Sequence, residues 1–171
     1  MFDVLAPHGN LSYWKTGFVN SVSPAVARTM VEFGRAAPSP LSQAEFMILG
    51  GKVAGIPNQD SAFGDRAGRF VYNLVANWTD AAQDSENIAW ARNFFNAMQP
   101  FSTGAAYANY LGDGDNRARD AFGANYDRLS QLKATYDSTN FSRTRRMFRL
   151  RPRSHPPGAR VYSRVRLGRG A

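Results

Sequence analysis

Hydrophobic and polar residues alternate in two segments, and this alternation predicts two β-strands. The first segment is residues 11–22, "LSYWKTGFVNSV", which is rich in aromatic and β-branched side chains. The second is residues 69–78, "RFVYNLVANW", where alternation places Asn73 and Asn77 on the same face as Val71 and Val75. Two amides among valines are unusual for a core face, so this face is a candidate for chemistry.

Three other segments repeat their hydrophobic residues with the period of an α-helix. In residues 23–37, Ser23 is the expected N-cap and Pro24 the first helical residue. Residues 79–99 form a second amphipathic segment that ends before Pro100. Residues 115–136 form a third, which Asp115 is expected to cap and Gly123 to interrupt.

Two further strands are expected between these helices. Residues 42–57 surround Gly50-Gly51, which suggests a strand with a bulge or a close backbone approach at the glycines, ended by Pro57. Residues 103–111, "TGAAYANYL", are expected to be a strand with Tyr107 and Asn109 on one face. The resulting order of elements predicts an α+β domain, in which an antiparallel β-sheet is flanked by helices on one side.

Composition narrows the class of protein. The 171 residues are 43% hydrophobic and 13% aromatic, which is typical of one globular domain. The absence of cysteine excludes disulfides, thiolate zinc sites and a cysteine nucleophile, and two histidines are too few to build a metal site. Neither a membrane span nor a signal peptide is recognisable, so we expect no membrane association and a cytoplasmic protein.

The net charge of +8 comes from the C-terminal end of the chain. Residues 143–171 contain ten arginines without a lysine or an acid, so removing them leaves −2 for residues 1–142. We therefore expect one domain at 1–142 and a disordered or frame-shifted Arg/Pro/Gly-rich tail at 143–171. Binding of nucleic acid or an acidic surface through this tail is an alternative function, but the absence of lysine and of regularly interleaved aromatics argues against it.

The stretch "AAYANYLG" at residues 105–112 concentrates hydrogen-bonding groups. One interpretation is structural: the tyrosine rings fill the core and Asn109 satisfies neighbouring backbone. The other is catalytic, although a tyrosine can act as a base only if its pKa falls well below its usual value near 10. Asn109 can both donate and accept hydrogen bonds, as the edge of a planar heterocycle such as a flavin requires.

Five segments, in order, resemble the C-terminal half of the berberine-bridge-enzyme-like FAD-linked oxidases, members of the vanillyl-alcohol-oxidase superfamily with a PCMH-type flavin domain. The segments are "YWKTGFV", "PSPLSQAEFMILGGKVAGIP", "SAFGDRAGRFVYNLVANW", "ENIAWARNFFNAMQPFSTGAAYANYLGD" and "FGANYDRLSQLKATYDSTN". The last two are similar to the short C-terminal module of that family. The resemblance implies that residues 1–142 are a partial substrate-binding domain with this module at its end.

The resemblance also implies a function. In the family the sheet forms one wall of a substrate pocket over a separate FAD domain, and the enzymes oxidise small molecules at an alcohol, a sugar hydroxyl or an amine. Carried over to this chain, Tyr110 would be the base, Asn73 and Tyr107 would orient the substrate, and Asn109 with Tyr107 would contact FAD. Arg66 matches the arginine of the family's "AFPHR" loop, here "AFGDR", and would contact the substrate.

Departures from the family pattern set two further expectations. The flavin-binding half is expected to be a missing N-terminal domain, so that FAD is not retained by this chain alone. A non-catalytic remnant is then an alternative to an active oxidase, because the site residues would look the same. If the flavin half is missing, the face with Asn73 and Asn109 is expected to expose a large apolar and amide patch.

Overall fold

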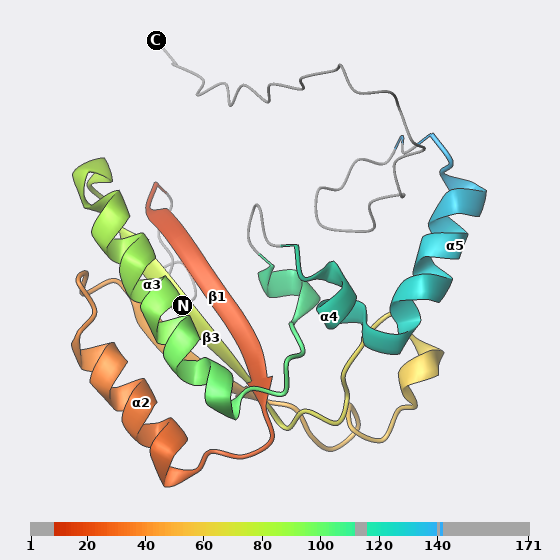
Figure 1. Cartoon of the computed structure of the whole chain (residues 1–171), viewed down its shortest axis with the longest axis horizontal. Coiled ribbons are helices and arrows are strands. Elements are labelled where there is room, and N and C mark those ends of the chain that lie inside the picture. The colour runs from red at the N-terminus through yellow and green to blue at the C-terminus, as the bar shows by residue number, and fades with distance from the viewer. Residues whose placement is uncertain (1–8, 112–115, 140, 142–171) are drawn as a thin grey trace.

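The computed structural model describes residues 9–111, 116–139 and 141. Three strands, β1 (Leu11–Val19), β2 (Gln43–Ile48) and β3 (Phe70–Trp78), form an antiparallel sheet in the order β1-β3-β2 (Figure 1). The alternating segment of residues 69–78 is therefore the central strand. Its residue Asn73 lies opposite Thr16 of β1 and Glu45 of β2.

Two helices cover one face of the sheet (Figure 1). Helix α2 (Pro24–Arg35) begins at Ser23, whose hydroxyl accepts a hydrogen bond from the backbone N–H of Val26, as the sequence predicted. Helix α3 (Asp84–Met98) contributes Phe94, whose ring stacks on Phe33 of α2 at 4.8 Å between centroids. The prediction of an α+β domain with a sheet flanked by helices on one side is confirmed.

The core between the sheet and these helices is aromatic and aliphatic. Its polar edges are satisfied, since the indole N–H of Trp78 donates to Asp84 (2.6 Å) and that of Trp90 donates to the Phe33 carbonyl (2.9 Å). The buried residues of this sheet core are Val19, Val26, Tyr72, Leu74, Ala76, Trp78, Trp90, Ala91, Phe94 and Met98.

The last described part of the chain is a helical region of residues 105–111 and 116–136. It contains a 3₁₀ turn, η4 (Ala108–Tyr110), a short helix α4 (Ala118–Phe122), a second 3₁₀ turn η5 (Gly123–Asn125) and helix α5 (Tyr126–Tyr136). The two helices lie on the opposite side of β1 from α2 and α3 (Figure 1). Gly123, at φ +50°, separates α4 from α5, which confirms the expected interruption.

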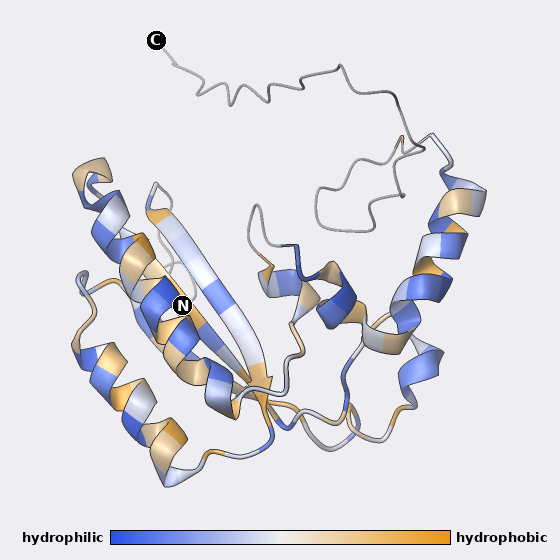
Figure 2. Cartoon of the chain, viewed as in Figure 1, coloured by the Kyte–Doolittle hydropathy of each residue, from blue (hydrophilic) through white to orange (hydrophobic). Residues whose placement is uncertain are grey.

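This helical region has a small core and a mostly hydrophilic surface, as the blue bands of α5 in Figure 2 show. Its buried residues are Ala106, Leu111, Ala121 and Phe122. The region docks through close backbone contact with the loop before β3: a Cβ atom on Gly64 would lie 2.4 Å from the carbonyl oxygen of Ala121.

Two predicted elements are wrong. Residues 103–111 contain a 3₁₀ turn and no strand. The backbone N–H of Thr103 donates one hydrogen bond to the Phe18 carbonyl of β1 at 2.9 Å. The chain then turns away from the sheet at Gly104, which has φ +85°. No bulge forms at Gly50-Gly51, since β2 ends at Ile48 and Gly51 lies in a turn at φ +55°. The expected cap Asp115 and the arginine-rich tail lie outside the described residues.

Candidate functional site

The face of the sheet opposite α2 and α3, called here the open face because neither helix covers it, carries the first part of the site. Its residues Thr16, Val71 and Asn73 are nevertheless buried, so the exposed apolar and amide patch expected from the sequence is wrong for this part of the face. Asn73 is 6% exposed, and its Nδ2 donates a hydrogen bond to Oε1 of Glu45 at 3.1 Å. The Oδ1 atom of Asn73 is buried and has no hydrogen-bond donor among the described residues. The second amide of this face is used differently, because Nδ2 of Asn77 is directed at the Leu41 carbonyl at 3.5 Å.

The 3₁₀ turn η4 brings two tyrosines to this face. Tyr107 contacts Phe18, which belongs to the open face of β1, at 6.3 Å between ring centroids, and it contacts Phe63 edge to face at 5.5 Å. The Tyr110 ring lies 5.2 Å from the Tyr107 ring. The turn thus places both tyrosines together, where the predicted strand would have pointed them to opposite faces.

The charge of Glu45 also acts on Tyr110. Burial raises the pKa of the Tyr110 hydroxyl above its ordinary value of 10.0, and the Glu45 carboxylate and Tyr107 raise this pKa further. Tyr110 is therefore protonated at neutral pH and available as a hydrogen-bond donor. The structure thus places Tyr107 and Tyr110 in contact with each other and Asn73 in contact with Glu45, whose charge acts on Tyr110.

The other two predicted site residues are placed apart from this cluster. Asn109 is exposed on η4. Arg66 is held in its own loop, where its guanidinium donates to the Val53 carbonyl (3.1 Å) and the Ser61 hydroxyl (2.6 Å). Within the described residues, Arg66 is linked to Tyr107 through the ring of Phe63, on which its guanidinium stacks at 5.1 Å.

Glu45 and Phe63 were not among the predicted site residues. Glu45 lies in β2, and the sequence did not show where this strand ends before Gly50-Gly51. The face of the sheet on which Glu45 lies is therefore known only from the register of β2 against β3. Asp65, which replaces the histidine of the "AFPHR" loop, accepts hydrogen bonds from the backbone N–H groups of Ala67 and Gly68, both at 3.0 Å. It stabilises the turn into β3.

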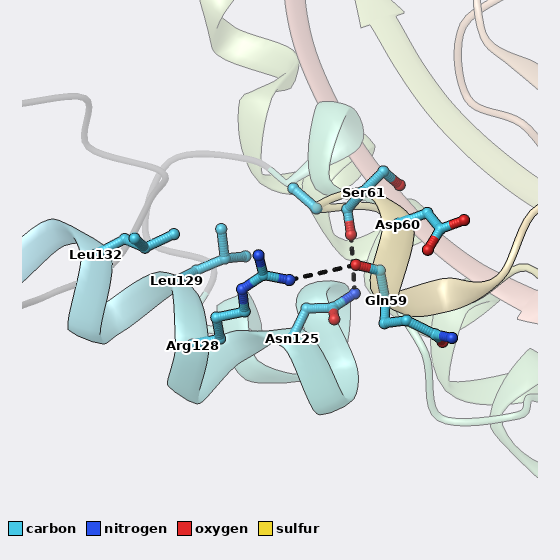
Figure 3. Close-up of a pocket in the computed structure, with 8 residues that line it drawn as sticks. Gln59, Asp60, Ser61, Asn125, Arg128, Leu129 and Leu132 are labelled. Carbon is cyan, nitrogen blue, oxygen red and sulfur yellow. Dashed lines mark hydrogen bonds between the residues drawn. The ribbon is translucent and has the colours of Figure 1, made fainter.

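Two hollows of the described surface lie away from Tyr107, Tyr110 and Asn73. A cleft of about 180 Å³ between residues 59–62 and α5 is lined by Asn125 and Arg128, which donate hydrogen bonds to backbone carbonyls of the loop (Figure 3). A wider cleft of about 550 Å³ lies at the Ile48 and Phe70 ends of β2 and β3, and its lining includes Arg66, one of the predicted site residues. Within the described ranges, no group of histidines and acids could hold a metal ion, and no helix is long and apolar enough to cross a membrane.

Comparisons with known proteins agree on one family. Residues 106–146 match the family model described as "Berberine and berberine like". An uncharacterised FAD-linked oxidoreductase of Bacillus subtilis (strain 168) is 32% identical over 113 residues, which are 66% of this chain and 24% of that protein. The chain thus spans about a quarter of the length of this curated relative.

Two solved structures share the fold at low sequence identity. BBE-like 1 from Physcomitrella patens gives a TM-score of 0.69 at 18% identity, covering 77% of this chain and 29% of that structure. A glycopeptide hexose oxidase complexed with teicoplanin gives 0.67 at 20% identity, with 77% and 31% covered. Residues 106–146 therefore match a berberine-bridge-enzyme-like module, and the longer sequence match is to a quarter of an FAD-linked oxidoreductase.

Proposed function

We propose that this chain forms one wall of the substrate pocket in an FAD-dependent oxidoreductase that acts on an alcohol, a sugar hydroxyl or an amine. The observation that carries the proposal is the tyrosine pair of η4, in which Tyr107 contacts Phe18 of the open face, the same face on which Asn73 donates a hydrogen bond to Glu45. The pair lies within the residues that match the family model. One structural neighbour is a glycopeptide hexose oxidase, which supports a hydroxyl-bearing substrate.

The residues of the open face fit a flavin. A flavin ring edge carries carbonyl oxygens and an N–H group, and it therefore needs both donors and acceptors opposite it. Asn109 offers an exposed amide that can donate and accept, whereas the unpaired Oδ1 of Asn73 is buried behind it in the wall. In this proposal Asn109 and Tyr107 hold the flavin, and bound FAD supplies the hydride acceptor.

The pKa direction limits what Tyr110 can do alone. A hydroxyl with a raised pKa is a poor base, because it must lose its own proton before it can accept one. The base role of Tyr110 thus requires a cation or a strong donor that the bound state brings to it. Without that partner, Tyr110 donates a hydrogen bond to the substrate, which Asn73 and Tyr107 orient.

Arg66 is the weakest member of the proposed substrate set. A direct contact with substrate would compete with its hydrogen bonds to Val53 and Ser61. Its stacking on Phe63, which contacts Tyr107, gives it a second route to the pocket through the position of the tyrosine. The two roles differ, because only direct contact requires the guanidinium to leave its loop.

A chimaera tests the proposal. Residues 9–141 replace the matching segment of the Bacillus subtilis relative, and the visible absorbance of oxidised flavin is followed without oxygen while alcohols, sugars and amines are added. We expect the chimaera to retain flavin and to be reduced by one of these classes. Tyr110→Phe should slow the reduction, whereas Tyr136→Phe should not, because that tyrosine is 83% exposed on α5.

Two outcomes would contradict the proposal. A chimaera that binds flavin but is reduced by none of these classes would favour the non-catalytic remnant. Equal reduction rates in the chimaera, Tyr110→Phe and Tyr136→Phe would remove Tyr110 from the chemistry and leave the wall without its central residue.

A further inference from the structure

The cleft of about 550 Å³ lies where β2 ends and β3 begins. The backbone N–H of Leu49 donates to the Arg69 carbonyl at 2.8 Å, which extends the pairing of Ile48 with Phe70 by one step before the chain turns at Gly51. Small-molecule sites in proteins usually measure about 300–1,000 Å³. The cleft is therefore large enough for a small organic ligand, beyond the size of a single ion.

Apolar side chains form one part of the cleft lining. They belong to Ile48, Leu49, Ala54 and Phe70, and Ile48 is 74% exposed although isoleucine is among the most often buried residues. The turn leaves the cleft open, since a Cβ atom on Gly50 would meet no atom within 4 Å. A ligand with an apolar part would gain free energy by covering this surface.

Two arginines form the charged part of the lining. Arg66 and Arg69 both line the cleft, and none of the described residues that line it is an acid. The carboxylate next to Arg66 in the sequence, that of Asp65, accepts hydrogen bonds from the backbone N–H groups of Ala67 and Gly68. No ion pair joins either arginine to another residue that the structure describes. A concave surface with charges of one sign attracts the opposite charge, so the favoured ligand is an anion.

The position of Arg66 is fixed before any ligand binds. Its two terminal nitrogens donate to the Val53 carbonyl and the Ser61 hydroxyl, and its guanidinium stacks on the Phe63 ring. Each terminal nitrogen carries two N–H groups and uses one of them in these hydrogen bonds, so one N–H group on each remains as a donor. Little side-chain entropy is lost when such a fixed group binds a ligand. Arg66 lines the cleft without leaving its loop, which a direct contact beside the tyrosine pair would require.

We propose that this cleft is a binding site for a small carboxylate that carries an apolar chain or ring. Arg66 and Arg69 bind the carboxylate, and Ile48, Leu49 and Phe70 contact the apolar part. Arginine binds a carboxylate through two parallel charge-assisted hydrogen bonds, an arrangement that a hydroxyl or an amine does not match. The inference goes beyond the proposed function, because this ligand occupies a second site and is bound there without being oxidised.

Three probes test the two parts of the site on the full 171-residue chain. Hexanoate has an apolar chain and a carboxylate, acetate lacks the chain, and hexan-1-ol lacks the charge. The ¹³C methyl signal of Ile48, assigned by its loss in Ile48→Val, reports binding inside the cleft, because the arginines of residues 143–171 can also attract anions. We expect hexanoate at millimolar concentration to shift this signal and to bind about tenfold more tightly than acetate or hexan-1-ol.

Two variants at exposed positions change the charge of the lining. Arg69→Gln removes one positive charge and should weaken hexanoate binding about fivefold, and Arg69 is chosen because Arg66 also holds its own loop. Arg28→Gln on the exposed surface of α2 is the matched control and should preserve the affinity. Ala54→Glu places a carboxylate in the lining and should abolish hexanoate binding while allowing hexylamine to bind, whereas Ala27→Glu on α2 should do neither.

The inference is overturned if acetate or hexan-1-ol binds as tightly as hexanoate, if Arg69→Gln binds hexanoate as tightly as Arg28→Gln does, or if no probe shifts the Ile48 signal. The same titration on the chimaera decides whether the cleft stays open in a whole oxidoreductase. We expect the Ile48 shift to be retained there, and its loss would make the cleft a contact between domains instead of a ligand site. None of these outcomes depends on flavin reduction, so the carboxylate site and the proposed function can fail separately.

Discussion

The sheet with its two helices and the helical region at the end of the chain are stabilised in different ways. The sheet core buries ten residues, six of them large apolar side chains of β3 and α3: Tyr72, Leu74, Trp78, Trp90, Phe94 and Met98. The core of the helical region buries four, two of which are alanines. Since apolar burial contributes about 25 cal/mol per Å², the sheet core supplies most of the hydrophobic stabilisation.

The helical region is held instead by backbone contact and hydrogen bonds to one loop. Gly64 and Gly123 lie close enough that side chains would clash, and Asn125 donates to the carbonyls of Asn58 (2.8 Å) and Ser61 (3.1 Å). The tyrosines of the candidate site belong to this weakly stabilised region, whereas Glu45 and Asn73 belong to the sheet. The site is therefore assembled by docking, and the docking contacts determine whether it exists.

The largest expected effect is loss of the sheet core. Phe94→Ala removes a ring that is fully buried, stacked on Phe33 and in contact with Trp90, so we expect the free energy of unfolding to fall by about 3–5 kcal/mol. Urea unfolding followed by circular dichroism measures the change. Val31→Ala, which truncates a 51% exposed residue of α2, is the control and should stay within about 0.5 kcal/mol. Similar losses in both variants would show that the core does not dominate stability.

Overpacking of the docking contact comes second. Gly64→Ala places a methyl group 2.4 Å from the Ala121 carbonyl, and since backbone lies on both sides, the helical region must move, at a cost of about 1–3 kcal/mol. Amide hydrogen exchange should accelerate in α4 and α5 and stay slow in β3. Gly50→Ala is the matched control, because a Cβ there meets no atom within 4 Å. Equal acceleration in β3 would mean that the two regions unfold together.

Most of the elements that the sequence predicted correctly belong to the sheet and its two helices. The strands around Thr16 and Asn73 and the helix capped by Ser23 were predictable, because local alternation, a cap and a proline agree with the tertiary structure. The break at Gly123 was predictable for the same reason. In the sheet region, each local pattern and the final packing favour the same conformation.

The helical region and the site were less predictable because long-range contacts determine them. The apolar run around Tyr107 has β-like composition, but it has no strand partner after Gly104 and forms a 3₁₀ turn. The sequence therefore named Tyr107, Tyr110 and Asn73 by resemblance and placed the tyrosines on the wrong element. Glu45 required the register of β2 against β3, which no local pattern contains.

A smaller effect is expected from removal of the side-chain hydrogen bonds that join the helical region to the loop with Asn58 and Ser61. Asn125→Asp keeps the shape of the side chain but replaces the donating Nδ2 with an oxygen facing the carbonyls of Asn58 and Ser61. We expect a loss of about 1–2 kcal/mol, confined to α4, α5 and the loop, which residue-resolved hydrogen exchange detects. Asn93→Asp, on the exposed side of α3, is the control. If both variants behave alike, the charge itself and not the lost hydrogen bond is responsible.

The smallest expected effect is a difference between the two regions in how folding stability depends on pH. Burial is the main cause that raises the pKa of both Tyr72, in the sheet core, and Tyr110, in the helical region, above 10.0. A raised pKa in the folded state means that the unfolded chain loses its proton first, so stability is constant below pH 10 and falls as the pH rises above it.

Tyr72→Phe and Tyr110→Phe should each reduce this alkaline loss of stability, as urea midpoints at about pH 9 and about pH 11 would show. We expect the larger reduction for Tyr72, because it is fully buried while Tyr110 is partly exposed. Tyr136→Phe, on the exposed side of α5, should leave the alkaline loss unchanged, and an equal reduction in all three variants would attribute the loss to general charge repulsion instead of to these two hydroxyls.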